Sequence, residues 1–165
     1  MKFRLGFVSN SSSSSFLVAF ARIPSSADEV HAMLFPGGPT SVHPYEHACV
    51  SSRDAAECVY HDMLNTDGPL KIEEIAKHVR RGSFPGQPKY PSRVWDLPAE
   101  ERDAALEKYE QESDEAAKKV AEEWLAELGD VAVFHFEYAD DDNFGTAMEH
   151  GGVFDKLPHL RISHH

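Results

Sequence analysis

Residues 131–139 read Val-Ala-Val-Phe-His-Phe-Glu-Tyr-Ala and form the clearest strand pattern in the chain. Successive side chains of a strand point to opposite faces of its sheet. His135 and Glu137 are therefore expected on one face. The opposite face is aromatic and carries Phe134, Phe136 and Tyr138. A sheet that contains this strand is the starting point for the fold.

The residues after this strand predict a hairpin near the C-terminal end. Residues 140–145 (Asp-Asp-Asp-Asn-Phe-Gly) are a turn signal. Residues 146–150 are expected to return as a paired strand. Residues 160–163 (Leu-Arg-Ile-Ser) predict one more short strand.

Two further strands are expected near the N-terminus. Residues 3–8 alternate apolar side chains with small or polar ones. Residues 16–23 are apolar at most positions, which is typical of a central strand buried on both faces. A serine-rich run at residues 9–15 separates the two.

Between these strands the pattern changes to that of helices. Ser26 and Glu29 match a capping box, which predicts a short helix to about residue 34. Ser52 is expected to cap a second helix that ends near residue 64. Apolar spacing over residues 72–79 predicts a third helix, whereas residues 40–50 are expected to be irregular.

The longest helix is expected over residues 96–128. Its ends are marked by an N-cap and a stop residue, Asp96 and Gly129. A continuous helix of this length would measure about 48 Å. This length exceeds the span of a compact domain of this size, so the helix is expected either to break near residues 113–114 or to project into solvent at its start. The preceding loop, residues 82–95, has three aromatic side chains expected to hold it to the body of the protein: Phe84, Tyr90 and Trp95.

These elements predict a single α+β domain over residues 1–165. A small, mostly antiparallel sheet, built from the N-terminal strands and the C-terminal hairpin, packs against several helices. The two cysteines, Cys49 and Cys58, are too few for a disulfide scaffold and are expected as buried free thiols. Apolar runs fall well short of the roughly 20 residues that span a bilayer, so we expect a cytoplasmic protein without membrane contact.

The charge of the chain restricts its partners. A net charge of −12 argues against nonspecific binding to nucleic acid or anionic lipid. Residues 100–130 hold twelve Asp and Glu against four Lys and Arg. Such a stripe is typical of a solvated helix face, and it also suits a basic surface on another protein. Another protein is therefore the expected partner, and the sequence indicates no oligomeric state.

The segment Gly6-Phe-Val-Ser-Asn-Ser-Ser-Ser-Ser-Ser-Phe16 resembles the opening of many small proteins of bacteria and their phages. The resemblance covers about eleven residues and implies kinship with that group without an activity. From the residues themselves, the run could be a structural turn, a flexible linker or an anion site. The candidate anion-binding residues are Ser9, Asn10, Ser11, Ser12 and Ser13.

Carboxylates and histidines gather in the last part of the chain. The candidate metal ligands are His135, Glu137, Asp140, Glu149, His150 and His164. Carboxylate oxygens and neutral imidazoles are ligands that Zn²⁺, Mn²⁺ or Fe²⁺ accept. The same residues could instead form a solvated acidic hairpin tip or a metal-free acid–base site. The spacing of residues 140–149 does not fit an EF-hand loop.

Two functions follow from these features. The first is a non-enzymatic bacterial or phage accessory protein that binds another macromolecule, supported by the acidic helix face and by the lack of a complete catalytic motif. The second is a divalent-metal hydrolase, of phosphoester type, that uses the C-terminal cluster, with the serine run holding substrate oxyanions. We expect the first function. The sequence indicates no certain cofactor, and the second function would require a divalent metal, Zn, Mn or Fe.

Overall fold

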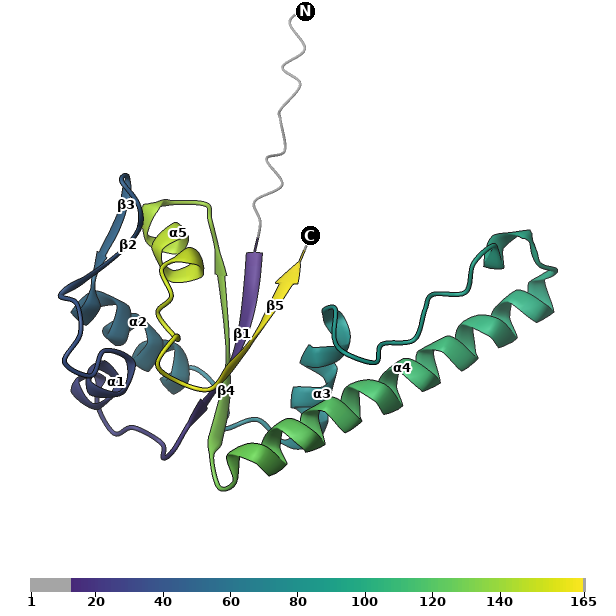
Figure 1. Ribbon diagram of the computed structural model, residues 1–165, viewed down its shortest axis with the longest axis horizontal. Coiled ribbons are helices and arrows are strands. Elements are labelled where there is room, and N and C mark those ends of the chain that lie inside the picture. The colour runs from purple at the N-terminus through teal and green to yellow at the C-terminus, as the bar shows by residue number, and fades with distance from the viewer. Residues whose placement is uncertain (1–12, 165) are drawn as a thin grey trace, which may run out of the picture.

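The computed structural model describes residues 13–164, with side chains up to residue 162. This part of the chain forms an α+β fold, as the sequence predicts (Figure 1). In chain order the elements are β1 (Ser13–Phe20), α1 (Ala27–Leu34), β2 (Ser41–Tyr45), β3 (Ala48–Ser51), α2 (Ser52–Leu64), α3 (Ile72–Arg81), the 3₁₀ turn η1 (Val94–Asp96), α4 (Ala99–Leu128), β4 (Ala132–Ala139), α5 (Asn143–His150) and β5 (His159–His164). The strand expected at residues 3–8 lies outside the described residues.

The main sheet has three antiparallel strands in the order β4-β1-β5. β1 is central, and Phe16 lies beside Phe136 on β4 and beside Arg161 on β5. Every β1 residue from Ser14 to Phe20 is buried, because helices cover both faces of the sheet. The central strand thus begins at Ser13, three residues earlier than predicted, and the end of the serine run is strand rather than linker or turn.

The two faces of this sheet carry different side chains. The aromatic face packs against α1, α2, α5 and the β2–β3 hairpin, and its rings are Phe16, Phe20, Phe134, Phe136, Tyr138 and Phe154. The aliphatic face packs against α3 and α4, through Leu17, Ala19, Ile75, Val79, Ala117, Ala121, Val133 and Ile162. Alternation along β1 and β4 assigns each side chain to its face.

The predicted strand at residues 146–150 is wrong, because this segment is the helix α5. Asp142 caps the helix by accepting a 2.7 Å hydrogen bond from the amide of Gly145. Ala147, Met148 and Glu149 are good helix formers, and all three are buried. A segment this short shows no decisive periodicity, so the cap decides between helix and strand.

α4 is continuous over 30 residues, and it does not break at residues 113–114. Of its buried residues, Ser113 lies at its midpoint, and Ala117 and Ala121 lie in its second half. Its first half extends beyond the sheet alongside the preceding loop (Figure 1). We call residues 82–112 the arm. The helix begins after Pro98 rather than at Asp96, which ends the short turn η1.

Other local predictions also change. Residues 40–50 are largely the β2–β3 hairpin rather than irregular. Ser51, not Ser52, caps α2 by accepting from the amide of Asp54. Both cysteines are free, but Cys49 is exposed and Cys58 only half-buried. Among the described residues, no helix is both long and apolar enough to cross a membrane.

Candidate metal centre

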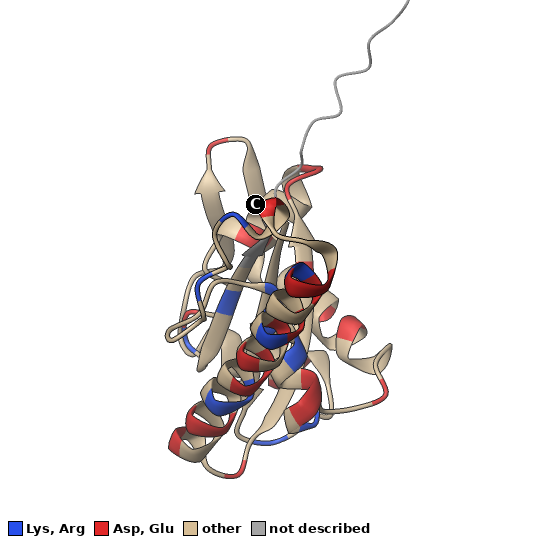
Figure 2. Ribbon diagram, turned by 90° about the vertical axis from the view of Figure 1, so that its right-hand side faces the viewer, with Lys and Arg blue, Asp and Glu red and all other residues tan. Residues whose placement is uncertain are grey.

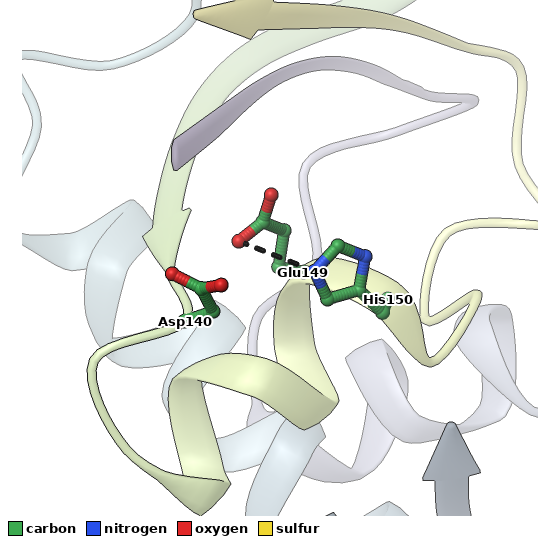
Figure 3. Close-up of side chains that lie close together, drawn as sticks. All are labelled: Asp140, Glu149 and His150. Carbon is green, nitrogen blue, oxygen red and sulfur yellow. Dashed lines mark ion pairs between the residues drawn. The ribbon is translucent and has the colours of Figure 1, made fainter. Parts of the chain in front are cut away.

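Three of the predicted ligands converge at one end of the sheet (Figure 3). Asp140, Glu149 and His150 each offer one ligand atom, and these atoms lie within 4.8 Å of one another. We call these three residues the cation cluster. Ligand bonds of about 2.0–2.6 Å place two donors of one ion at most roughly 4–5 Å apart. The cluster is therefore within reach of a single divalent ion with little movement.

The cluster is assembled by the end of β4 and the last turn of α5. Asp140 directly follows the final residue of β4, Ala139. Gly145 packs so closely against the Ala139 carbonyl that a side chain there would clash with it. This close approach turns α5 back along the strand. Glu149 and His150, at the end of α5, are thereby brought to Asp140.

Glu149 is the buried member of the cluster, with 1% of its side chain exposed. The hydroxyl of Ser14 donates a 2.8 Å hydrogen bond to Glu149 Oε1. Arg161 Nη2 lies 3.6 Å from the same oxygen, and His150 Nε2 lies 3.7 Å from Oε2. Burying a carboxylate costs several kcal/mol unless charges or hydrogen bonds compensate it. The fold supplies such partners to this buried carboxyl group from β1, β5 and the end of α5.

Arg161 is held in place by two side chains of β1. Its Nε and Nη2 both donate to the Ser14 hydroxyl, at 3.2 and 3.1 Å. Its guanidinium also lies 5.6 Å above the Phe16 ring. The Ser14 hydroxyl thus accepts from Arg161 and donates to Glu149, which uses both of its hydrogen-bonding roles. Ser14 links β1 to both charged groups.

A cleft of about 180 Å³ opens beside the cluster. Its polar lining residues are Glu149, His150, Asp155, His159 and Arg161. The Leu157 carbonyl can only accept, so the 3.0 Å contact with His159 Nδ1 makes that nitrogen the donor. His159 Nε2 is then the nitrogen able to accept a proton. The cleft combines a buried carboxylate, an arginine and two histidines, with Phe16 and Phe154 as apolar walls.

The remaining predicted ligands lie elsewhere or outside the description. His135 and Glu137 project from the opposite face of β4, and the His135 ring stacks on His78 of α3 with centroids 3.8 Å apart. Neither belongs to the cation cluster. His164 belongs to β5, where its backbone pairs with that of Ser13 on β1, but its side chain is not among those described.

The predicted anion site is placed only in part. Ser9, Asn10, Ser11 and Ser12 lie outside the described residues. Ser13 pairs through its backbone with Ala139 and His164 as the first residue of β1. The serine that reaches the cluster is the next one along, Ser14.

The sequence analysis did not identify Ser14, Arg161 and His159 as site residues. Their side chains meet the cluster only because β1 and β5 are neighbours in the sheet. A serine on a strand buried on both faces needs a hydrogen-bond partner, but the predicted strand began at residue 16 and left Ser14 in the serine run. The sequence does not say which residue that partner is.

A second polar group lies at the edge of the aromatic face. The Tyr138 hydroxyl donates a 3.0 Å hydrogen bond to Asp62 on α2. Burial, followed by the charge of Asp62, raises the pKa of the Cys58 thiol to about 11. Burial also raises the pKa of Tyr138 well above its usual range. The Cys58 thiol and the Tyr138 hydroxyl therefore remain protonated at neutral pH, and with Asp62 they form a structural contact away from the cleft.

Comparisons with protein-family models, with curated proteins and with solved structures gave no match to this chain. The geometry of the described residues is therefore the basis for the functional proposals.

Proposed function

We propose that the chain binds one divalent cation at Asp140, Glu149 and His150 and uses it to activate water for hydrolysis. The observation that carries this proposal is the convergence of two carboxylates and one imidazole beside a cleft. This donor set suits Mn²⁺, Fe²⁺ or Zn²⁺. Three protein ligands leave coordination positions for water, as catalytic sites require.

The chemistry expected of such an ion is the supply of hydroxide. A bound cation lowers the pKa of its water toward neutrality. That water would give its proton to a base, for which His159 Nε2 is the candidate in the cleft. The hydroxide would then add to the electrophilic atom of an ester. The bond to the leaving oxygen would break, and that oxygen would take up a proton.

The first test is Mn²⁺ binding, followed by electron paramagnetic resonance and calorimetry. We expect one ion per chain, with affinity reduced by more than about tenfold in Asp140→Asn, Glu149→Gln and His150→Ala. Asp141→Asn is the matched control, since Asp141 is an exposed acid of the same turn that is not part of the cluster. Circular dichroism checks that each variant folds.

Two results would overturn the proposal. One is the absence of saturable Mn²⁺, Fe²⁺ or Zn²⁺ binding in the folded wild-type chain. The other is an equal loss of affinity in Asp141→Asn and Asp140→Asn, which would indicate diffuse attraction to the acidic turn. If ions bind at the cluster but no ester is hydrolysed, the hydrolytic part of the proposal fails and the cation site remains.

A second function, the binding of another protein, is supported by the arm. Trp95 is 70% exposed and Tyr90 52% exposed on this projecting segment. Both still contact α4, because the Tyr90 and Tyr109 rings meet edge-on with centroids 5.2 Å apart and the Arg102 guanidinium lies 5.7 Å from the centre of the Trp95 ring. Phe84 packs against the aliphatic face. An exposed tryptophan on an ordered support is typical of residues that dominate binding energy. Figure 2 marks the Asp and Glu residues of α4 in red and its Lys and Arg residues in blue, and the excess of acids over residues 100–130 suits a basic partner.

The arm is tested by placing a photo-crosslinking residue at position 95 in cells and identifying the captured protein. The purified partner should then bind the wild-type chain and bind Trp95→Ala at least about tenfold more weakly. Leu64→Ala is the control, because Leu64 is 64% exposed on α2 and lies outside the arm. Equal binding by Trp95→Ala and wild type would exclude the arm as the contact.

A further inference from the structure

The charges around the cleft predict what accompanies a bound cation. Arg161 Nη2 lies 3.6 Å from Glu149 Oε1, so the guanidinium faces the carboxylate. A divalent ion at the cluster would neutralise both carboxylates, Asp140 and Glu149. The guanidinium of Arg161, whose side chain is 41% exposed, would then lose its nearest counter-charge. An unpaired charge in this position attracts an anion.

A contact with His150 strengthens this coupling. Arg161 Nη2 lies 3.5 Å from His150 Nδ1, and a guanidinium can only donate, so Nδ1 is the acceptor. Nε2 of the same ring faces Glu149. An ion that takes Nε2 as its ligand would therefore bind beside Arg161, whose guanidinium already contacts the same ring.

The cleft has the size of one small group. Its volume of about 180 Å³ is below the roughly 300–1,000 Å³ typical of sites for drug-sized ligands. Asp155 also lines the cleft, and both its carboxylate and the Arg161 guanidinium are exposed, so water screens both charges. Arg161, whose position is fixed by Ser14, is the one permanent cation among the described residues that line the cleft.

We propose that this cleft, with a cation bound as in the proposed function, binds the oxyanion of a phosphate or phosphate ester between the cation and Arg161. A tetrahedral oxyanion has oxygens pointing in different directions, so one can bind the ion while others accept from the guanidinium. A carboxylate has only two oxygens and a single negative charge, so it would couple the ion to Arg161 more weakly than a phosphate group, which carries about −1.5 to −2 at neutral pH. Ser14 positions Arg161 and does not itself contact the anion.

The test is the coupling between Mn²⁺ and inorganic phosphate in the purified full chain. Mn²⁺ affinity is measured by calorimetry with and without phosphate, corrected for the Mn²⁺–phosphate complex that forms in buffer. We expect phosphate to tighten Mn²⁺ binding about tenfold, and Mn²⁺ to tighten phosphate binding by the same factor. Phenyl phosphate should replace inorganic phosphate, whereas acetate should give a factor near one.

Three variants assign the coupling to Arg161. Arg161→Gln should bind Mn²⁺ at least as tightly as wild type when phosphate is absent, because a nearby positive charge is removed, but its coupling factor should fall to about one. Arg161→Lys, which keeps the charge without the planar fork, should lie between the two. Lys156→Gln is the control, since Lys156 is an exposed cation that lines the neighbouring hollow rather than this cleft.

The outcomes separate this inference from the proposed function. If Mn²⁺ does not bind, the proposed function fails, and the inference fails with it. If Mn²⁺ binds but phosphate leaves its affinity unchanged in wild type, only the phosphate site is overturned. Coupling that persists in Arg161→Gln, or that is lost equally in Lys156→Gln, would overturn the role of Arg161. Acetate that couples as strongly as phosphate would overturn the substrate class.

Discussion

The aromatic and aliphatic faces of the same three-stranded sheet are packed with different kinds of side chain. On the aromatic face, large rings fill the space beneath short helices, and the charged Glu149 is buried at its end. On the aliphatic face, the small residues Ala117 and Ala121 let one long helix approach closely. That helix keeps its charges in solvent, where i,i+4 pairs such as Lys118 with Glu122 are worth only a few tenths of a kcal/mol.

This difference indicates where chemistry can occur. A solvated acidic helix lowers no reaction barrier, because water screens its charges. A buried carboxylate with an arginine, two histidines and a cleft beside it acts in a medium of lower dielectric, where its interactions are stronger. The acidic stripe of α4 dominates the composition, but the single buried acid of α5 is the stronger functional candidate.

The largest expected effect is the removal of one ring from the aromatic face. Phe154 is 2% exposed and contacts the rings of Phe16, Phe136 and Tyr138. Phe154→Ala should lower the free energy of unfolding by about 4 kcal/mol, measured by urea denaturation. Phe144→Ala, at a position 38% exposed, is the control and should cost much less. Equal losses would show that this face is not packed as described.

Next in size is the steric test of how α5 is attached. In Gly145→Ala the new methyl group would meet the Ala139 carbonyl, so α5 must shift. We expect a loss of about 3 kcal/mol and weakened Mn²⁺ binding, since Asp140 and Glu149 would separate. At Gly38 an added methyl group would make only ordinary contacts, of 3.6 Å, so Gly38→Ala is the control. Unchanged stability in Gly145→Ala would refute the close contact of α5 with β4.

On the aliphatic face, the substitution expected to lower stability is the enlargement of a small buried side chain. Ala121 is fully buried on α4 against the sheet and α3. Ala121→Leu should overfill this interface and cost about 2 kcal/mol, measured by urea denaturation. Ala126→Leu places the same side chain on the exposed side of the same helix and should be nearly neutral. Mn²⁺ affinity should be unchanged in both variants, because the cation cluster belongs to the other face.

A smaller effect, a pH dependence, distinguishes the two cysteines. The pKa of Cys58 is about 11 in the folded chain and about 9 in a free thiol, so the folded state holds this proton more tightly. The associated stability is present below pH 9 and is lost as the pH rises through 11. At pH 8, Cys58 should contain about a hundredfold less thiolate than a free thiol. Mass spectrometry after iodoacetamide treatment should show exposed Cys49 alkylated first, and equal rates would contradict the burial of Cys58.

The smallest effect on stability is expected at the end of the arm. Trp95→Ala should change the free energy of unfolding by less than about 0.5 kcal/mol, because this side chain is 70% exposed. The neighbouring Val94 is 1% exposed, so Val94→Ala should cost about 1.5 kcal/mol. A large loss in Trp95→Ala would mean that the tryptophan supports the fold rather than a binding surface.

Several elements could be predicted because their signals are local. The alternation of residues 131–139 predicts β4, and the Ser26–Glu29 pair predicts α1, whose cap has the Ser26 hydroxyl accepting from the Glu29 amide at 3.2 Å. The strand predicted at residues 146–150 was wrong because five residues fit the helical period as well as the strand period. Asp142, whose cap decides for the helix, lay in a segment that the sequence predicted to be a turn. Of the six predicted ligands, three converge because α5 folds back onto β4.

The sequence by itself determined the fold class, the central buried strand, the long helix and the residue types available for a metal, since each depends on periodicity or on capping between near neighbours. Only the tertiary structure decided that Ser14, Glu149 and Arg161 meet, although 135 and 147 residues separate Ser14 from the other two. Strand pairing and burial bring them together, and such contacts depend on which surfaces exclude water. No local pattern contains that information.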